Sequence, residues 1–280
     1  MVCMYNILFI DIDGTLLTKR DGRQYIPPSA ADAITEVRAR GALVYLCTGR
    51  SLADAQFIWN LGCPHANVDG IIGASGGMVL DGNSILFHKT LGAPAVEDLE
   101  HFMQAHNVHY YMECNEGIFF DEEFMALARR TWGVAHIKNW DTIARPLDEA
   151  DRSKVNKLCF RTWNADVTME EVRAQFGERF YIVPASHGDP TVVAGEVSCK
   201  GVNKATAIEL LLKHLALPDV RTFGFGDSSN DIEMLDACDE AIVMGDAREP
   251  YVKEHATYVT SPVLDDGIAH AMAHFGLISL

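Results

Sequence analysis

Short runs of apolar residues alternate with amphipathic segments at the start of the chain. Residues 5–10, 42–47 and 68–73 each predict a buried strand, because apolar side chains occupy most positions of these runs. Between the strands, apolar residues recur at helical spacing over 30–40, and a serine begins a second helical segment over 51–61. The order strand, helix, strand, helix, strand predicts a parallel, doubly wound sheet.

The pattern changes after the third strand. Two short apolar runs flank Asp81-Gly82-Asn83, which predicts a hairpin. Residues 88–190 then combine helices with strands of more amphipathic character, which indicates a sheet that packs on one side only. The expected helices are 93–107, 121–132 and 168–176, and the expected strands are 109–113, 154–162, 180–185 and 190–194. We interpret this stretch as a separate α+β domain inserted into the first domain.

The doubly wound pattern returns at Glu196. The expected elements are a helix over 202–215, a strand over 221–226, a helix over 231–237, a strand over 240–244 and a helix over 265–274. The predicted fold class is α/β: a doubly wound, Rossmann-like parallel-sheet core with an inserted α+β cap domain. The predicted boundaries are 1–87 for the first core segment, 88–190 for the cap and 191–280 for the second core segment.

Composition and charge restrict the partners. The 280 residues are 48% hydrophobic, which favours a globular chain with a large core. A formal net charge of −16, without a run of Lys and Arg, argues against a nucleic-acid partner. We expect no membrane partner either, because no apolar run is long enough to cross a bilayer and the first residues do not resemble a signal peptide. Seven cysteines without metal-binding spacing indicate a reduced, cytoplasmic protein, and the oligomeric state stays open.

Four polar stretches lie where strands are predicted to end or helices to begin, the edge at which open α/β sheets bind ligands. They are Asp11-Ile12-Asp13-Gly14-Thr15, Thr48-Gly49-Arg50, Lys200-Gly201 and Gly226-Asp227-Ser228-Ser229-Asn230-Asp231. Their carboxylates are the ligands that a hard divalent cation such as Mg²⁺ prefers. Their hydroxyl, amide and amino groups can hold a phosphate. This combination is typical of phosphoryl transfer.

Each stretch taken alone has a structural explanation. Asp-Gly after a strand is an ordinary turn, and Asp and Ser commonly begin helices. A lone lysine such as Lys200 is most often a solvated surface charge. The occurrence of all four stretches at the expected element ends is what favours a functional site.

With these motifs, the chain resembles the haloacid dehalogenase-like hydrolase superfamily, and in particular the Cof-type phosphatases with the class IIB cap. The further matching segments are Glu196-Val197-Ser198-Cys199, Ile232-Glu233-Met234-Leu235, Met244-Gly245-Asp246-Ala247 and Asp265-Asp266-Gly267-Ile268. The chain departs from the family pattern in two places. The family commonly has Asn where this chain has Asp246, and often Gly-Glu where it has Ser228-Ser229.

The resemblance implies a role for each motif residue. Asp11 would be the nucleophile that forms an aspartyl-phosphate, and Asp13 the general acid and base. Lys200 would be the third catalytic residue. The implied Mg²⁺ ligands are Asp11, the main-chain carbonyl of Asp13, Asp227 and, through water, Asp231. The implied phosphate-binding residues are Thr48, Gly49 and Asn230.

The leading hypothesis is a Mg²⁺-dependent phosphatase for a phosphomonoester of a small metabolite, for example a sugar phosphate. A phosphomutase would use the same aspartyl-phosphate. A non-catalytic phosphoacceptor or metal-binding regulatory module is a third possibility, against which Asp13 and the large cap count. Polar and aromatic cap residues that either contact substrate or belong to the core are Tyr110, Tyr111, Glu113, Arg161, Trp163 and His187.

Overall fold

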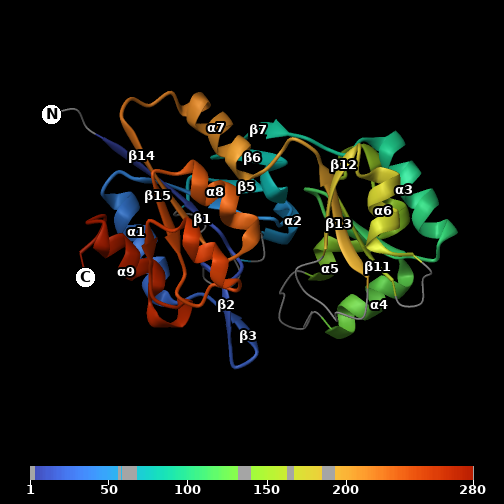
Figure 1. Cartoon of the computed structure of the whole chain (residues 1–280), viewed down its shortest axis with the longest axis horizontal. Coiled ribbons are helices and arrows are strands. Elements are labelled where there is room, and N and C mark those ends of the chain that lie inside the picture. The colour runs from blue at the N-terminus through green and yellow to red at the C-terminus, as the bar shows by residue number, and fades with distance from the viewer. Residues whose placement is uncertain are drawn as a thin grey trace. The chain divides into compact units, whose positions relative to one another are not determined.

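The computed structural model describes residues 4–55, 58, 68–131, 140–162, 167–184 and 193–279 (Figure 1). The chain divides into two compact units. The core unit comprises Met1–Gly49, Ile58–His88 and Val202–Leu280, and the cap unit comprises Arg50–Phe57 and Lys89–Gly201. The cap unit is therefore an insertion between the segments of the core unit.

The core unit is built on an eight-stranded sheet of order β16-β15-β14-β1-β4-β5-β6-β7. Neighbouring strands are parallel from β16 to β5, whereas β6 and β7 pair antiparallel around Gly82. The strands are β1 (Tyr5–Ile10), β4 (Leu43–Cys47), β5 (Gly70–Gly73), β6 (Met78–Asp81), β7 (Ser84–His88), β14 (Val220–Gly226), β15 (Glu240–Val243) and β16 (Tyr258–Val259). The predicted doubly wound core and the predicted hairpin are both confirmed.

Helices cover both faces of the core sheet (Figure 1). They are α1 (Pro28–Ala39), α7 (Lys204–Leu215), α8 (Ile232–Ala237) and α9 (Gly267–His274). Phe9 of β1 packs in one cluster with Ile208 of α7 and Met234 of α8. On the opposite face the rings of Phe223 and Phe275 lie 5.5 Å apart at the end of α9, which packs on α1. None of the helices in the described ranges combines the length and apolarity of a membrane span.

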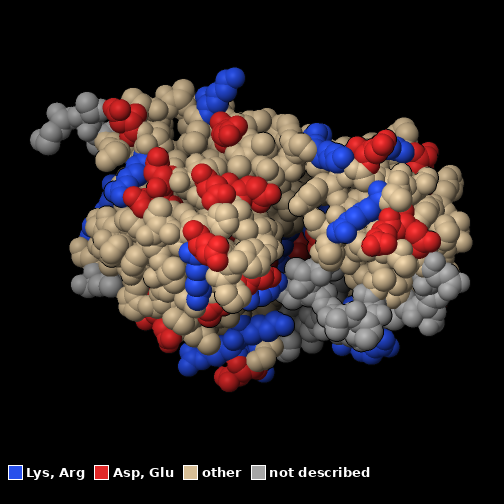
Figure 2. Space-filling model, in the orientation of Figure 1, with Lys and Arg blue, Asp and Glu red and all other residues tan. Residues whose placement is uncertain are grey.

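A short hairpin projects from the core unit immediately after the first polar motif. Its strands are β2 (Thr18–Arg20) and β3 (Arg23–Tyr25), which pair antiparallel. Lys and Arg side chains gather over it in the space-filling view (Figure 2). Further short turns of helix are η3 (Ala74–Gly76), η7 (Ser229–Asp231), η8 (Pro250–His255) and η9 (Val263–Asp265).

The cap unit contains a six-stranded sheet of order β10-β9-β8-β11-β13-β12. The strands are β8 (His109–Glu113), β9 (Ile118–Phe120), β10 (Ala144–Pro146), β11 (Lys157–Arg161), β12 (Phe180–Pro184) and β13 (Ala194–Cys199). The helices are α2 (Leu52–Ala55), α3 (Ala93–Ala105), α4 (Glu122–Thr131), α5 (Trp140–Ile143) and α6 (Met169–Phe176), with short turns η5 (Leu147–Glu149) and η6 (Arg152–Lys154). Helix α6 begins with the capping box of Thr168 and Glu171.

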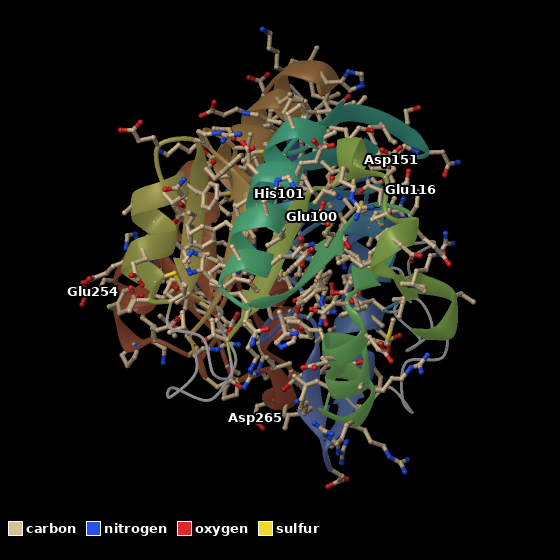
Figure 3. All side chains as sticks on the ribbon, turned by 90° about the vertical axis from the view of Figure 1, so that its right-hand side faces the viewer. Glu100, His101, Glu116, Asp151, Glu254 and Asp265 are labelled. Atoms are coloured by element: carbon tan, nitrogen blue, oxygen red, sulfur yellow. The ribbon has the colours of Figure 1, made fainter. Side chains whose placement is uncertain are left out.

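The two faces of the cap sheet differ. On one face the Tyr110 hydroxyl donates to Glu100 at 3.1 Å, and the rings of Phe102 and Phe176 join α3 to α6. Figure 3 labels Glu100 on α3. On the other face Tyr111 stacks against Phe120 of β9 and contacts α4. The predicted packing on one side only is therefore incomplete, because α4 covers part of the second face.

The second domain junction differs from the sequence-based boundary at 190/191. Ala194–Cys199 pairs antiparallel with both β11 and β12, so this strand belongs to the cap sheet and the core resumes at Val202. The strand shows alternating burial, typical of a sheet with two unlike faces. The sequence pattern predicted that residues 191–280 belong to the core, because the Lys200-Gly201 motif directly follows this strand. Most of the predicted strand 190–194 lies outside the described residues.

Arg38 of α1 and Arg40, which follows the end of α1, offer a test of what holds the core helices to the sheet. Arg38 donates two hydrogen bonds to Asp69, at 2.9 and 2.7 Å, and Asp69 also accepts from the Val44 amide. Arg40 pairs with Glu36, but its side chain is 43% exposed. A bidentate, partly buried pair contributes more than an exposed one.

We expect Arg38→Ala to lower the free energy of unfolding by about 2 kcal/mol. Arg40→Ala is expected to cost only about 0.5 kcal/mol, because water competes for the exposed pair. Urea unfolding followed by circular dichroism measures both values. Equal losses in the two variants would contradict this account.

Candidate active site

The first polar motif lies at the end of β1. Asp11 is 4% exposed and its amide donates to the Phe225 carbonyl at 3.0 Å, so it continues the pairing with β14. Asp13 is half-buried and forms an isolated bridge with Leu17 as the chain turns away. Burial of Asp11 therefore follows from its place at the end of a central strand rather than from packing by its own side chain.

The second acidic motif follows the neighbouring strand β14. Asp227 is 4% exposed and Asp231 is fully buried. One carboxylate oxygen of Asp231 accepts from the amides of Asp227 and Ser228, at 3.0 and 3.1 Å. Asp231 thus fixes the turn that carries Asp227. Asn230 is exposed, and its side-chain oxygen accepts from the Ser228 hydroxyl at 2.6 Å.

Thr48 and Gly49 lie at the end of β4, on the other side of β1. Thr48 is 1% exposed, its amide donates to Ile72 at 2.8 Å, and its carbonyl accepts from Ser75 at 3.0 Å. The strand order β14-β1-β4 therefore brings the ends of three adjacent parallel strands together. Strand order reverses here, at the topological switch point where such sheets bind ligands.

A lysine that the sequence analysis did not single out occupies the centre of this arrangement. The Lys204 amino group lies 2.7 Å from Asp11 Oδ1 and 2.5 Å from Asp231 Oδ1, and its side chain is 1% exposed. Lys204 is the first residue of α7, where the side chain of Asn203 caps the helix. This ion pair joins the second core segment to β1.

The structure does not place Lys200 in this cluster. Lys200 is exposed, belongs to the cap unit, and donates to the Glu178 carbonyl at 3.2 Å. The structure therefore places Lys204, and not Lys200, beside Asp11, and the helix begins at 204 rather than 202. Lys200 as the catalytic lysine stays a prediction from the sequence. The signal was present in the sequence: Lys204, Ala207, Ile208 and Leu211 form the buried stripe of the helix at i, i+3, i+4 and i+7.

The electrostatics of the cluster are those of several carboxylates sharing one lysine. Burial disfavours the charge on Lys204, but Asp11 and Asp231 raise its pKa overall. Burial and the nearby Asp231 raise the pKa of Asp227 to about 7. The Lys204 ammonium does not balance the carboxylates, so a further cation would be favoured here.

The donor atoms fit such a cation. Asp11, Asp227 and Asp231 each offer a carboxylate oxygen, and these atoms lie within 4.8 Å of one another. Both oxygens of Asp231 already accept hydrogen bonds, whereas Asp227 Oδ1 is buried without a hydrogen-bond partner in the described part of the chain. An all-oxygen set with one unsatisfied carboxylate oxygen matches a hard divalent ion.

Gly14 lies against this carboxylate. Its φ of +92° is in the left-handed region, and a Cβ there would lie 2.2 Å from Asp227 Oδ2. Any larger residue would displace the Asp227 carboxylate as well as strain the turn.

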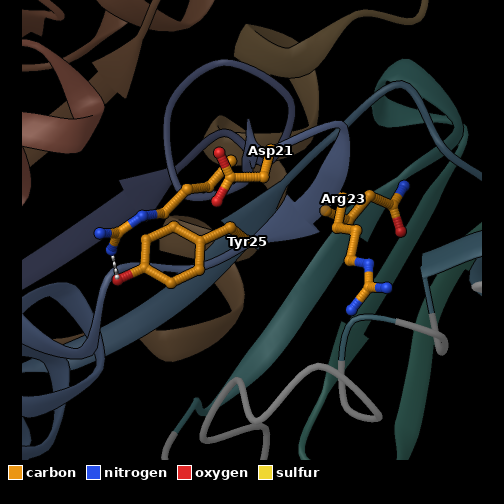
Figure 4. Close-up of a pocket in the computed structure, with 5 residues that line it drawn as sticks. Asp21, Arg23 and Tyr25 are labelled. Atoms are coloured by element: carbon orange, nitrogen blue, oxygen red, sulfur yellow. Dashed lines mark hydrogen bonds between the residues drawn. The ribbon is translucent and has the colours of Figure 1, made fainter.

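Other predicted residues lie elsewhere. The Tyr110 hydroxyl contacts α3, and Glu113 forms a charged cluster within the cap unit. Asp246 is exposed and accepts from the Val263 amide at 3.2 Å. Trp163 and His187 lie outside the described residues. A surface pocket of about 430 Å³ is lined by hairpin residues Arg20, Asp21, Arg23, Gln24 and Tyr25 (Figure 4), and includes none of the predicted site residues.

Comparison with known proteins places this site in a family. A model described as haloacid dehalogenase-like hydrolase matches residues 8–272. The chain belongs to this family of hydrolases.

Individual relatives are named phosphatases. The 5-amino-6-(5-phospho-D-ribitylamino)uracil phosphatase YcsE of Bacillus subtilis is 25% identical, over 97% of this chain and 96% of its own. An HMP-PP phosphatase of Serratia proteamaculans is 28% identical, over 87% of this chain and 85% of its own. The structure of the HAD subclass IIB sugar phosphatase BT4131 matches with a TM-score of 0.75 and 25% identity, over 98% of this chain and 100% of that one. The predicted subclass and the predicted phosphoric monoester hydrolase are confirmed.

Gly14→Ala tests whether the Asp227 carboxylate must sit where it does. We expect phosphatase activity to fall by about 100-fold, because the new methyl group displaces an acidic side chain of the site. Release of p-nitrophenol from p-nitrophenyl phosphate measures this loss.

Gly41→Ala is the matched control, since Gly41 has a φ of +93° and no atom within 4 Å of a built Cβ. Both variants pay the backbone cost of about 1 kcal/mol for a left-handed alanine. Only Gly14→Ala should lose activity, and a similar loss in the control would show that backbone strain is the cause.

Proposed function

We propose that the protein is a Mg²⁺-dependent phosphatase that hydrolyses a phosphomonoester of a small metabolite through an aspartyl-phosphate on Asp11. The observation that carries the proposal is the burial of Asp11 beside Lys204, Asp227 and Asp231 at the switch point of the sheet. Carboxylates are buried in this way only where charges oppose them or chemistry requires them.

Asp11 and Asp13 divide the chemistry of the two half-reactions. A carboxylate oxygen of Asp11 attacks phosphorus as the ester P–O bond breaks, and Asp13 gives its proton to the departing oxygen. Asp13 then takes a proton from water, whose oxygen attacks the phosphoryl group. Inorganic phosphate leaves and the Asp11 carboxylate is restored.

Lys204 opposes the other influences on the nucleophile, because burial and the nearby Asp231 raise the pKa of Asp11 whereas the Lys204 ammonium lowers it. Its ammonium group hydrogen-bonds Asp11 Oδ1 and therefore favours the ionised carboxylate and fixes its rotamer. Thr48, the Gly49 amide and Asn230 are proposed to bind phosphoryl oxygens, as donors aimed at the charge that develops there.

Asp11, the Asp13 carbonyl and Asp227 would hold Mg²⁺, with Asp231 behind them. When bound, the ion would neutralise charge on the phosphoryl group. The unpaired, buried Asp227 Oδ1 supports this assignment. The named relatives act on small phosphorylated metabolites, and one is a sugar phosphatase, which supports a substrate of that size.

Asp11→Asn tests the nucleophile. We expect turnover to fall by at least about 10⁴-fold, because an amide cannot form the aspartyl-phosphate. The fold should persist, since Asn has nearly the same shape and Lys204 keeps Asp231 as a partner.

The control is Asp239→Asn, a carboxylate that only accepts hydrogen bonds from Thr222 near the start of β14. It should keep the wild-type turnover. Phosphate release with Mg²⁺, measured without a bisphosphate activator, separates a phosphatase from a phosphomutase. A long-lived phosphoaspartate with no phosphate release would favour the regulatory module, and full activity of Asp11→Asn would sink the mechanism.

Lys204→Met and Lys200→Met distinguish the two lysines. We expect the first variant to lose about 10³-fold in kcat and the second to keep wild-type activity, because only Lys204 contacts Asp11. Steady-state kinetics and thermal melting of both variants provide the measurement. Loss of activity in Lys200→Met alone would restore the sequence-based assignment.

A further inference from the structure

A buried charged cluster lies inside the cap unit, apart from the acidic site of the core. The Lys157 amino group lies 3.2 Å from Glu113 Oε1 and 3.1 Å from Glu196 Oε2, and the Lys157 and Glu113 side chains are 9% and 7% exposed. The three residues come from adjacent strands β11, β8 and β13. Burying such charges is costly and seldom increases stability, so the cluster requires another explanation.

The second carboxylate oxygen of Glu113 suggests an explanation for this buried cluster. Glu113 Oε2 accepts from the Ser51 amide at 3.3 Å, and Ser51 is fully buried. Ser51 immediately precedes α2, whose Ala53 packs with Ile118 and Phe120 of the cap sheet. The segment that follows Thr48-Gly49-Arg50 is therefore held by the cap unit.

The residue on the other side of this segment is held by the core unit. Thr48 pairs with Ile72 and Ser75 through its backbone, and a Cβ on Gly49 would lie 3.3 Å from Ser75 Oγ. Only Gly49 and Arg50 separate the last residue fixed by the core from the first one fixed by Glu113. Gly49 and Arg50 therefore link a residue held within the core unit to a residue held within the cap unit.

We propose that Glu113 is a positioning residue, which holds the Ser51 amide and thereby sets the Gly49 amide for the phosphoryl group. This inference rests on the proposed function, in which Thr48 and Gly49 bind the phosphate. Lys157 keeps the Glu113 carboxylate in place between the strands. Glu113 itself touches no reacting atom in this account.

Three substitutions at this position separate the hydrogen bond from the charge. Glu113→Ala removes both. Glu113→Gln keeps one acceptor oxygen for the two donors that Glu113 serves, Lys157 and the Ser51 amide, so its activity should lie between those of Glu113→Ala and the wild type. Glu113→Asp keeps the charge for Lys157 but is one methylene shorter, so it should lose the contact with Ser51 while the fold is retained.

Glu100→Ala is the matched control. Glu100 is a buried carboxylate of the same unit, 8% exposed, that pairs with Arg152 at 3.0 Å and accepts from Tyr110 on the other face of the sheet (Figure 3). Its loss should reduce stability in the same manner as the loss of Glu113. Within the described part of the chain its side chain contacts Tyr110 and Arg152 rather than Ser51, so the kinetics should not change.

The experiment measures kcat, KM and inhibition by inorganic phosphate for all variants of the full-length protein with Mg²⁺. A misplaced binding group costs up to about 100-fold, so we expect kcat/KM to fall by about 10-fold or more in Glu113→Ala and Glu113→Asp. Inhibition by phosphate should weaken in parallel. Glu113→Gln should lie between Glu113→Ala and wild type, and Glu100→Ala should match wild type.

Amide hydrogen exchange of residues 48–51 gives a readout that does not require activity. Faster exchange at Ser51 in Glu113→Ala and Glu113→Asp, but not in Glu100→Ala, is expected. Folded Glu113→Asp with wild-type kinetics and wild-type exchange would overturn the proposal. If the wild-type protein releases no phosphate, the proposed function fails, and the exchange result alone then decides whether Glu113 holds this segment.

Discussion

The ion pair of Lys204 with Asp11 and Asp231 is the interaction on which the site depends. It joins the end of the first strand to the first turn of α7, 193 residues later, and to the turn after β14. An ammonium group without these carboxylates could not remain at 1% exposure, and the carboxylates would repel one another without it. The other oxygen of Asp231 accepts hydrogen bonds from two backbone amides. The same carboxylate therefore orients the lysine and holds the loop that carries Asp227.

The doubly wound sheet explains why these groups meet. Strands β14, β1 and β4 are parallel neighbours, and each is followed by one polar motif. Each of these three strands brings its motif to the same edge of the sheet, where the backbone turns away and leaves room for a ligand. Gly14 adds a local condition, because only a residue without a Cβ lets the turn after β1 approach the Asp227 carboxylate.

The cap unit contains a sheet with two unlike faces. Its sheet has one apolar face under α3 and α6 and another face that carries Glu113, Lys157 and Glu196 among aromatic residues. Through Ser51 and α2, this second face holds a segment that the sequence order assigns to the first core segment. The boundary between the two units therefore falls between Gly49 and Arg50, inside the Thr48-Gly49-Arg50 motif.

Sequence alone determined the core strands β1, β4, β5, β14 and β15, the hairpin around Gly82, the extent of α6 and the identity of the acidic motifs, because periodicity and turn chemistry are local properties. The pattern placed Lys204 on the apolar stripe of its helix but could not show that this lysine is buried against Asp11, because that contact joins distant segments. Nor could it place Ala194–Cys199 in the cap sheet or attach α2 to the cap, because antiparallel pairing and helix docking are contacts between distant segments. Local sequence patterns identified the acidic motifs. Only the tertiary structure decided which carboxylates lie against which buried lysine, since those contacts depend on packing across the whole sheet.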